Sequence, residues 1–587
     1  MHPKQSPSSR RADLTAIAAV FALLIGMTAA AGIVRPPPAH AQAAMPATAV
    51  LTPADAPIYV AVTIDPASRQ LMLADALLRR LGLGDAVDEF WAGASEDLIG
   101  TAGFDEGNRL AGAELGIVVT DLAAATGDDS DGESAPGLVA ILSLPAHAAD
   151  VFTEEESALA QRAADADKTV ERATYNGVTI VSVPEDQAIA QFGDVVVFAD
   201  TPQDLYPVID VHAGDAPALA DEADVAKLRA DLPTAAIAFA YVDGEALRAP
   251  LQQATIEDPT LAPFVASLAP KMNHRFALAL SADVGQVRLD LRLAPGTGMA
   301  APADHPAPEL ALDQQVPADT LLFLNGIDLG ESTGFETLIL LIAQGVASLV
   351  SDQTGVVPLE PAQYFEAASR VLTFDLRDDF ARQLVGEYGL AASATSLDVG
   401  GVDAVLVSGV DDPLPVADAT SKLAVLLNAA TFDNGAGTGP VPGAKEVDGG
   451  LIQVLDLPVD EDGTVLHLEF GVAGQRFLLG YRSGLSDFLA GPAETLAGNP
   501  RYQEAMAALP AERDWQLYLD LGRLIPLAQQ ADESLAADTT SLDLSSVQSL
   551  AAAGFTRNGL RGMTMVLAVP AADGAADGTP VATPAAS

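Results

Sequence analysis

The chain has no cysteine among its 587 residues. This absence excludes disulfide bonds, thiolate metal sites, a cysteine nucleophile and a lipid anchor attached through a cysteine. Stability must therefore come from hydrophobic cores, and a hydrophobic content of 49% with a mean hydropathy of +0.25 indicates folded structure through most of the chain. Lysine is almost as scarce. Only five lysines follow residue 41: Lys168, Lys227, Lys271, Lys422 and Lys445.

Basic residues are few relative to acidic ones, because 30 lysines and arginines face 80 aspartates and glutamates. The formal net charge is −50 at pH 7. A surface of this charge repels nucleic acid and anionic lipid headgroups, so we expect no nucleic-acid partner. We interpret the charge as a feature that keeps the surface solvated, with an acidic binding face as the alternative.

Residues 1–41 have the features of an export signal. A basic N-terminal region precedes the apolar run Leu14–Val34, and Ala39-His40-Ala41 is a small-x-small cleavage site before Gln42. We predict export and cleavage at that site. An uncleaved anchor remains open, because the run is about as long as the roughly 20 residues that span a bilayer. Ser9-Arg10-Arg11 leaves a twin-arginine route open as well. Later runs of that length all contain charges, so we expect the remainder to be soluble.

One stretch of the chain returns near its other end. Residues Leu232–Leu247 (LPTAAIAFAYVDGEAL) recur without a gap as Leu509–Leu524 (LPAERDWQLYLDLGRL). Each copy starts with Leu-Pro, which cannot continue a helix, and runs as an apolar strand to an aspartate that can cap the next helix. We interpret the recurring tyrosines as packed on a sheet and the recurring aspartates as helix caps. These residues are Tyr241 and Asp243 in the first copy and Tyr518 and Asp520 in the second.

Further segments recur in the same order on both sides of a proline-rich stretch. The matching pairs are Pro53-Ala54-Asp55 with Pro317-Ala318-Asp319, Leu110-Ala111-Gly112 with Leu384-Val385-Gly386, and Tyr175-Asn176-Gly177 with Asp448-Gly449-Gly450. A period of this length exceeds the 20 to 50 residues of solenoid repeats. We interpret it as the duplication of a whole domain.

Strand patterns, hairpin signals and interspersed helical patterns predict an α+β fold. We predict two homologous tandem domains, each a largely antiparallel sheet with helices packed on one face. The predicted boundaries are a signal at 1–41, a first domain at 50–295, a proline-rich linker at 296–315, a second domain at 316–570 and a disordered tail at 571–587.

The last two strands of the first domain are the clearest in the chain. Residues 276–281 and 286–293 flank Asp283-Val284-Gly285, which is typical of a hairpin turn. Apolar and polar residues alternate along the second strand, so we expect Arg288, Asp290 and Arg292 to face water. Asn558-Gly559 predicts the corresponding hairpin turn in the second domain.

Three segments resemble a known family. They are Pro53–Pro66 (PADAPIYVAVTIDP), Phe104–Gly112 before a predicted strand, and Tyr175–Val181 (YNGVTIV). Together with the signal or anchor, they are similar to the exported bacterial proteins catalogued as domain of unknown function 3352. The resemblance implies an extracytoplasmic location and a fold, and it brings no catalytic residues with it.

The segment Gly330-Glu331-Ser332-Thr333-Gly334 matches the G-x-S-x-G of a nucleophile elbow and lies between a predicted strand and a predicted helix. Thr333 with Glu336 makes a capping box, which explains the same residues as a helix start. A hydrolase of this kind also needs an acid and then a histidine, and only His467 follows Ser332. We therefore keep a serine hydrolase using Ser332 as an alternative function.

Acidic clusters suggest, at most, weak calcium binding. Residues Pro458–Gly463 followed by Glu469 fit several positions of a calcium loop but have proline at the first position. A hairpin turn explains that segment more simply. A second cluster, Asp128, Asp129 and Asp131, lacks the terminal glutamate. A weak calcium-binding surface module is the third alternative.

Other motif classes have no support. The histidines lack the H-x-x-x-H spacing of zinc sites. The segment Gly435–Gly443 lacks the lysine and hydroxyl of a phosphate loop, so we interpret it as a surface loop. We predict no catalytic, cofactor or metal residues, and a non-enzymatic binding or structural role in the cell envelope. A carrier for an apolar ligand is the concrete version, because the composition is unusually aliphatic.

The export signal gives a direct test. We expect the exported protein to start at Gln42, because the cleavage site precedes that residue. Intact mass and N-terminal sequencing of the exported protein measure this. A mass that includes residues 1–41 would instead indicate an uncleaved anchor.

Overall fold

A computed structural model describes most of the chain. The described residues are 44–88, 109–121, 137–184, 186–257, 271–303, 308–332, 335, 339, 343, 361–398, 400–433, 443–458, 465–531 and 543–570. The predicted signal, the tail, the acidic cluster at 128–131 and most of the predicted calcium loop lie outside them.

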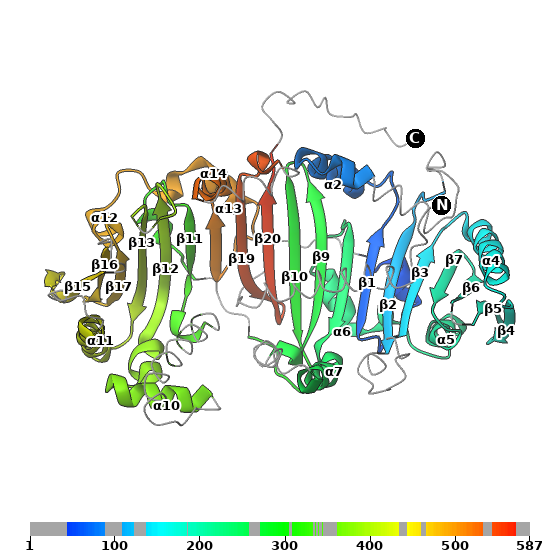
Figure 1. Cartoon of the computed structure of the whole chain (residues 1–587), viewed down its shortest axis with the longest axis horizontal. Coiled ribbons are helices and arrows are strands. Elements are labelled where there is room, and N and C mark those ends of the chain that lie inside the picture. The colour runs from blue at the N-terminus through cyan, green and yellow to red at the C-terminus, as the bar shows by residue number, and fades with distance from the viewer. Residues whose placement is uncertain are drawn as a thin grey trace.

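The described residues form one large antiparallel sheet with helices around it, which confirms the α+β class. Figure 1 shows the strands as a long arched row. The first ten strands are β1 (Ile58–Thr63), β2 (Glu114–Asp121), β3 (Gly137–Ser143), β4 (Glu171–Tyr175), β5 (Val178–Val183), β6 (Gln187–Phe192), β7 (Val195–Ala199), β8 (Ala238–Asp243), β9 (His274–Asp283) and β10 (Gln286–Pro295). The others are β11 (Leu322–Ile327), β12 (Leu384–Ala394), β13 (Val402–Val410), β14 (Gly443–Val447), β15 (Gly450–Pro458), β16 (Val465–Ala473), β17 (Arg476–Tyr481), β18 (Trp515–Leu519), β19 (Ser549–Arg557) and β20 (Leu560–Ala568).

The strands pair in the same order in the two halves of the chain. In the first half the spatial order is β4-β5-β6-β7-β3-β2-β1-β8-β9-β10. In the second half it is β14-β15-β16-β17-β13-β12-β11-β18-β19-β20. We call two positions equivalent when they have the same place in this order. Tyr59 opposite Tyr241, for example, is equivalent to Phe323 opposite Tyr518.

The pairing of β10 with β20 joins the two halves into a single sheet. It runs from Gln286 opposite Ala568 to Leu293 opposite Arg561. The sequence predicted two sheets and a linker, and it contained no sign that the last strands of the two halves would meet. In Figure 1 these strands lie in the middle of the row.

Helices lie near the outermost strands and beside the two rows formed by the ends of the strands (Figure 1). They are α2 (Arg69–Arg80), α4 (Ala148–Asp165), α5 (Tyr206–Ala213), α6 (Ala223–Ala230), α7 (Gly244–Glu257), α10 (Pro361–Leu372), α11 (Pro413–Asp433), α12 (Gly484–Ala490), α13 (Pro500–Ala507) and α14 (Leu521–Ala531). Short 3-10 helices η1 (Ala47–Val50) and η8 (Leu312–Gln314) precede the first strand of each half.

Helices cover both faces of at least one end of the sheet, where the sequence led us to expect one face. On β5, Ile180 packs in one core with Ile209 of α5, whereas Val181 packs in another with Leu159 of α4. Successive residues of a strand point to opposite faces, so α4 and α5 lie on opposite sides. The mostly apolar sequence of β5, VTIVSV, is consistent with burial on both faces.

Several local predictions are confirmed. Tyr241 and Tyr518 are buried in the two largest cores, one in each half. Asp243 Oδ1 accepts a hydrogen bond from the Glu245 N–H at 2.9 Å, and Asp520 Oδ1 accepts one from the Arg523 N–H at 3.1 Å. Both aspartates therefore cap the start of a helix. The predicted turn at Asn558-Gly559 has φ of 54° and 68°, the left-handed conformation that this residue pair tolerates.

The prediction that Arg288, Asp290 and Arg292 of β10 face water is wrong for Asp290 and Arg292. Asp290 is 0% exposed and Arg292 is 1% exposed. The alternation along β10 is real, but its polar face meets other parts of the chain. Charged groups at such a site need partners, since an isolated buried charge costs several kcal/mol or more.

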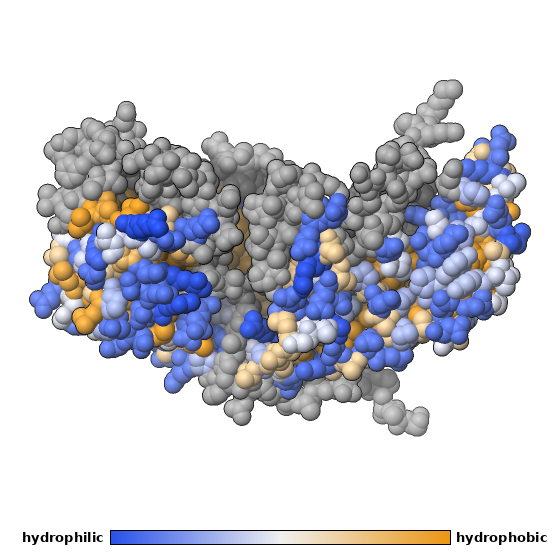
Figure 2. Space-filling model, turned by 90° about the horizontal axis from the view of Figure 1, so that it is seen from below, coloured by the Kyte–Doolittle hydropathy of each residue, from blue (hydrophilic) through white to orange (hydrophobic). Residues whose placement is uncertain are grey.

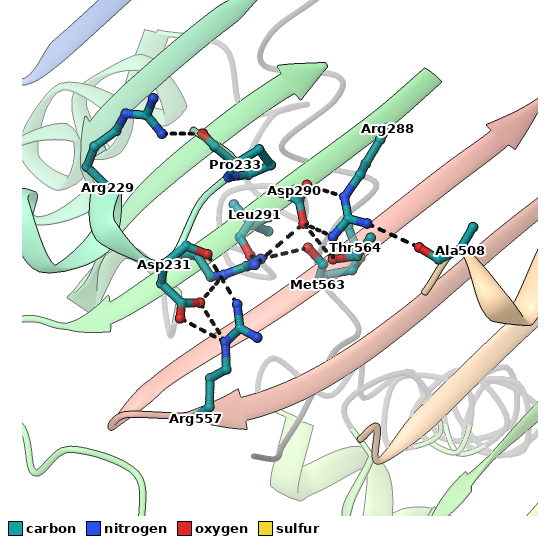
Figure 3. Close-up of polar contacts among 11 residues, drawn as sticks. Arg229, Asp231, Pro233, Arg288, Asp290, Leu291, Ala508, Arg557, Met563 and Thr564 are labelled. Carbon is teal, nitrogen blue, oxygen red and sulfur yellow. Dashed lines mark hydrogen bonds and ion pairs between the residues drawn. The ribbon is translucent and has the colours of Figure 1, made fainter. Parts of the chain in front are cut away.

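The partners of Asp290 come from β10 and β20 (Figure 3). Arg288 Nε lies 2.6 Å from Asp290 Oδ2, and Thr564 Oγ1 donates to Asp290 Oδ1 at 2.6 Å. Arg292 Nη2 lies 3.4 Å from Asp290 Oδ1. Burial opposes ionisation of Asp290, but these groups outweigh it and hold the pKa of its carboxyl below the ordinary value.

The second acid of the cluster, Asp231, follows α6 and binds two arginines (Figure 3). Arg292 Nε lies 2.5 Å from Asp231 Oδ2, and Arg557 Nε lies 2.8 Å from Asp231 Oδ1. Both guanidinium groups also lie over the ring of Phe555, at 4.6 Å and 4.8 Å from its centroid. We call Asp231, Asp290, Arg288, Arg292 and Arg557 the central ion cluster.

The central ion cluster predicts a strong effect of removing one acid. Asp290→Ala leaves Arg288 and Arg292 partly unpaired at the junction of the halves, so we expect the free energy of unfolding to fall by roughly 3–5 kcal/mol. Urea denaturation measures this. The control is Asp88→Ala, which breaks an exposed ion pair with Arg79 at the same 2.6 Å distance and should leave the unfolding midpoint nearly unchanged. Equal shifts in the two variants would contradict the assigned role.

Candidate functional site

A pocket of about 970 Å³ lies in the first half, beside the junction with the second. Its walls come from residues 44–46, β1, the start of α2, the end of α6 with residues 231–237 after it, the β9–β10 hairpin and the β19–β20 turn. The second half thus contributes Arg557 and Asn558 to a site otherwise built by the first. We call this site the central pocket.

The N-terminal wall of the central pocket is held in place by Glu114 on β2. Glu114 Oε1 accepts hydrogen bonds from the N–H of Thr48 at 2.8 Å and from its hydroxyl at 2.7 Å. Gly116 permits this approach, because a Cβ there would lie 2.6 Å from Thr48 Oγ1. At the equivalent place Glu387 Oε1 accepts from the N–H groups of Ala311 and Leu312.

The lining of the central pocket is partly apolar and partly charged. Leu73, Ile237 and Phe239 contribute apolar surface. Five arginines also line it, namely Arg69, Arg229, Arg288, Arg292 and Arg557, together with three acids, Glu114, Asp231 and Asp283. Five positive and three negative side chains give the lining a formal charge of +2. The whole chain has −50, so the pocket is a local reversal of charge.

Three of these arginines already have carboxylate partners in the central ion cluster. Arg229 differs, because its hydrogen bonds go to neutral carbonyl oxygens of Ala44 at 3.1 Å, Pro233 at 2.6 Å and Thr234 at 3.3 Å. It is 5% exposed, and burial lowers the pKa of its guanidinium, against the smaller effects of Glu114 and Tyr59. Arg69 is exposed and has no hydrogen-bond or ion-pair partner among the described residues.

Different side chains occupy the equivalent region of the second half. Asn325 and Gln516 stand opposite each other on β11 and β18, where the first half has Ala61 and Phe239. Met506 precedes Tyr518 by twelve residues, as Arg229 precedes Tyr241. Gln516 Nε2 donates to the Tyr502 hydroxyl at 3.0 Å, and that hydroxyl donates to Asp313 Oδ2 at 3.2 Å.

This second region holds buried acceptors that lack donors among the described residues. They are Asp313 Oδ1, Asn325 Oδ1, both carboxylate oxygens of Asp514 and Gln516 Oε1. Asp514 is 2% exposed, and burial raises the pKa of its carboxyl to about 8. It is equivalent to Ile237 of the central pocket, because each lies four residues before the recurring tyrosine, Tyr518 or Tyr241.

Ser332 occupies an ordinary helix cap. Its backbone is extended, with φ −71° and ψ 131°, and Ser332 Oγ accepts a hydrogen bond from the Phe335 N–H at 3.2 Å. A nucleophile elbow requires a strained turn at the serine. Gly330 has a packing reason, because a Cβ there would lie 2.0 Å from the Ala381 carbonyl oxygen. Thr333 and Gly334 lie outside the described residues.

His467 and Glu469 lie on β16 and have partners of their own. His467 Nδ1 lies 2.6 Å from Asp456 Oδ1 on β15, and Glu469 Oε1 lies 2.7 Å from Lys445 Nζ on β14. Residues 459–464 of the predicted calcium loop and 435–442 of the glycine-rich loop lie outside the described residues. Within the described ranges, no group of three or more histidines and acids could hold a metal ion. No helix in the described part of the chain is long and apolar enough to span a membrane.

Comparison with known families supports the resemblance noted in the sequence. The family described as Protein of unknown function (DUF3352) matches residues 111–569. The chain belongs to this DUF3352 family. No curated protein sequence matches it.

Two solved structures show weak similarity. The "Structure of crystal form III of TP0453" has a TM-score of 0.23 at 10% identity, and the "Structure of crystal form I of TP0453" has a TM-score of 0.22 at 12% identity. Each match covers 44% of this chain and 82% of that one. These similarities carry no argument about the fold or the function of this DUF3352 protein.

The sequence did not predict that the arginines of the central pocket lie together. Arg229, Arg288, Arg292 and Arg557 are up to 328 positions apart in the sequence, and only the pairing of β10 with β20 brings the last of them to the others. A usable signal was present, since three arginines lie near predicted strands in a chain that has few basic residues. The alternation along the predicted strand led us to expect two of them, Arg288 and Arg292, to face water.

The pKa of Asp514 predicts a pH dependence of stability. Between about pH 4 and 8 the folded state keeps this proton and the unfolded state releases it, so stability falls as the pH rises, by at most about 1.4 kcal/mol per pH unit. Asp514→Asn should remove this slope, as measured by urea denaturation at pH 5 and pH 8. Asp55→Asn, at an exposed position, should retain it. Parallel slopes in the wild type and Asp514→Asn would overturn the assignment.

Proposed function

We propose that this DUF3352 protein is a non-enzymatic binding protein of the cell envelope, exported by its N-terminal signal, and that the central pocket holds a small molecule with an apolar part. The observation that carries this proposal is the pocket itself. Its volume of about 970 Å³ is within the range of roughly 300–1,000 Å³ that is usual for ligand sites. Its mixed lining fits an amphipathic ligand better than the purely apolar one expected from composition.

We also propose that the two halves are homologous domains that arose by duplication. The repeated pairing order, the two glutamates that bind η1 and η8, and the aspartates that cap α7 and α14 support this. The isolated bridges Pro53–Ala218 and Pro317–Thr495 also occupy equivalent places.

The halves then differ at the site. Ala61, Phe239 and Arg229 border a pocket in the first, whereas Asn325, Gln516 and Met506 stand at the equivalent places in the second. We propose that the first half binds the ligand and that the second half completes the wall with Arg557. No described feature favours the serine hydrolase or the calcium module, since Ser332 caps a helix and Glu469 binds Lys445.

Native mass spectrometry tests this function. Protein purified from the envelope without added lipid should show a native mass above its denatured mass, because a bound molecule is released on denaturation. Thr234→Trp should reduce the excess, since Thr234 lines the central pocket and is exposed.

The matched control for this experiment is Ala511→Trp. Ala511 is exposed and occupies the equivalent loop of the second half, one residue after Leu-Pro. We expect it to keep the full excess mass. Identical native and denatured masses, together with no uptake of amphipathic probes, would overturn the proposed function.

A further inference from the structure

We infer that the ligand of the central pocket carries an anionic group, and that Arg229 and Arg69 bind it. This inference rests on the proposed function, because it names the chemical class of ligand for the same pocket. It predicts that the central pocket prefers an anionic ligand, although the whole protein has a net charge of −50.

The first argument is the charge balance around the pocket. Arg288 is neutralised by Asp290, and Arg292 and Arg557 share Asp231. Asp283 accepts from a backbone N–H in its own turn. Arg229 and Arg69 line the same pocket without a carboxylate at hydrogen-bond distance among the described residues.

The second argument is the state of Arg229. A guanidinium has five N–H donors, and Arg229 uses Nε, Nη1 and Nη2 once each, which leaves one donor on each terminal nitrogen. Its acceptors are neutral carbonyls, so its charge is not balanced by them. A buried cation is costly unless paired, and two donors on adjacent nitrogens match the geometry of a carboxylate or phosphate.

The nearest built-in acid does not replace such a ligand. Glu114 acts on Arg229 through space, without a hydrogen bond between them, and its Oε1 accepts from both donors of Thr48. Removal of Glu114 from that contact would release the N-terminal wall of the pocket. The charge of Arg229 therefore remains available to a molecule that enters.

The third argument is the contrast with the second half. The position equivalent to Arg229 is Met506, which is buried and uncharged. The cationic residue occurs in the half that has the central pocket. The apolar surface of Leu73, Ile237 and Phe239 next to it gives the site an apolar part and a cationic part.

Three probes of equal chain length test the inference by isothermal titration calorimetry: decanoate, 1-decanol and decyltrimethylammonium, each below its aggregation concentration. We expect decanoate to bind at least tenfold more tightly than decanol. Non-specific attraction to a chain of charge −50 would favour the cation instead, so preference for the anion has to come from a local site.

Two variants test whether Arg229 and Arg69 form that site. Arg229→Met introduces the side chain that the second half has at the equivalent position, Met506. Arg69→Gln removes an exposed charge that makes no hydrogen bond or ion pair with other described residues. Each should weaken decanoate binding about tenfold and leave decanol binding within twofold. Arg476→Gln, an exposed arginine on β17 outside the pocket, is the control and should change neither.

The outcomes separate the inference from the proposed function. If decanol binds as tightly as decanoate, and Thr234→Trp blocks both, the pocket binds ligands but the anionic class is wrong. If none of the three probes binds and the native protein carries no excess mass, the proposed function itself fails. Should Arg229→Met not fold, unchanged decanoate binding by Arg69→Gln would still overturn the assignment.

Discussion

The antiparallel pairing of β10 with β20 is the contact on which the rest of this structure depends. Asp290 and Thr564 are directly opposite each other in that pairing, and each is the fifth residue after the turn glycine of its hairpin. They are therefore equivalent positions that meet on an approximate two-fold axis. Two aspartates there would repel each other, whereas an aspartate and a threonine form a hydrogen bond of 2.6 Å. The difference between the halves at this point replaces a like-charge contact with a hydrogen bond across the junction.

The same junction brings arginines from both halves of the chain into the central pocket. Arginines on β10 and at the end of β19 extend from the junction into the central pocket, where Asp231 orders two of them. The second half differs at the equivalent positions, since Met506 and Gly562 stand where the first half has Arg229 and Arg288. The central pocket therefore lies in the first half, and the second half supplies part of its wall through Arg557 and Asn558.

Local features of the fold were predictable because they depend on neighbours in sequence. Turn residues such as Asn558-Gly559, the capping roles of Asp243 and Asp520, and the burial of the two tyrosines all follow from short-range chemistry and periodicity. The prediction for β10 failed for the opposite reason. Alternation shows that Asp290 and Arg292 share a face, but it does not show what covers that face.

The sequence by itself determined the class of the fold, the acidic surface, the absence of cysteine chemistry and the family. The hydrophilic surface is evident in Figure 2, where blue residues cover most of the coloured area of that face. Only the tertiary structure decided that the two halves share one sheet and that Arg229, Arg288, Arg292 and Arg557 line a single pocket. The physical reason is that strand pairing and charge clustering are long-range: residues up to 328 positions apart become neighbours only when β10 pairs with β20.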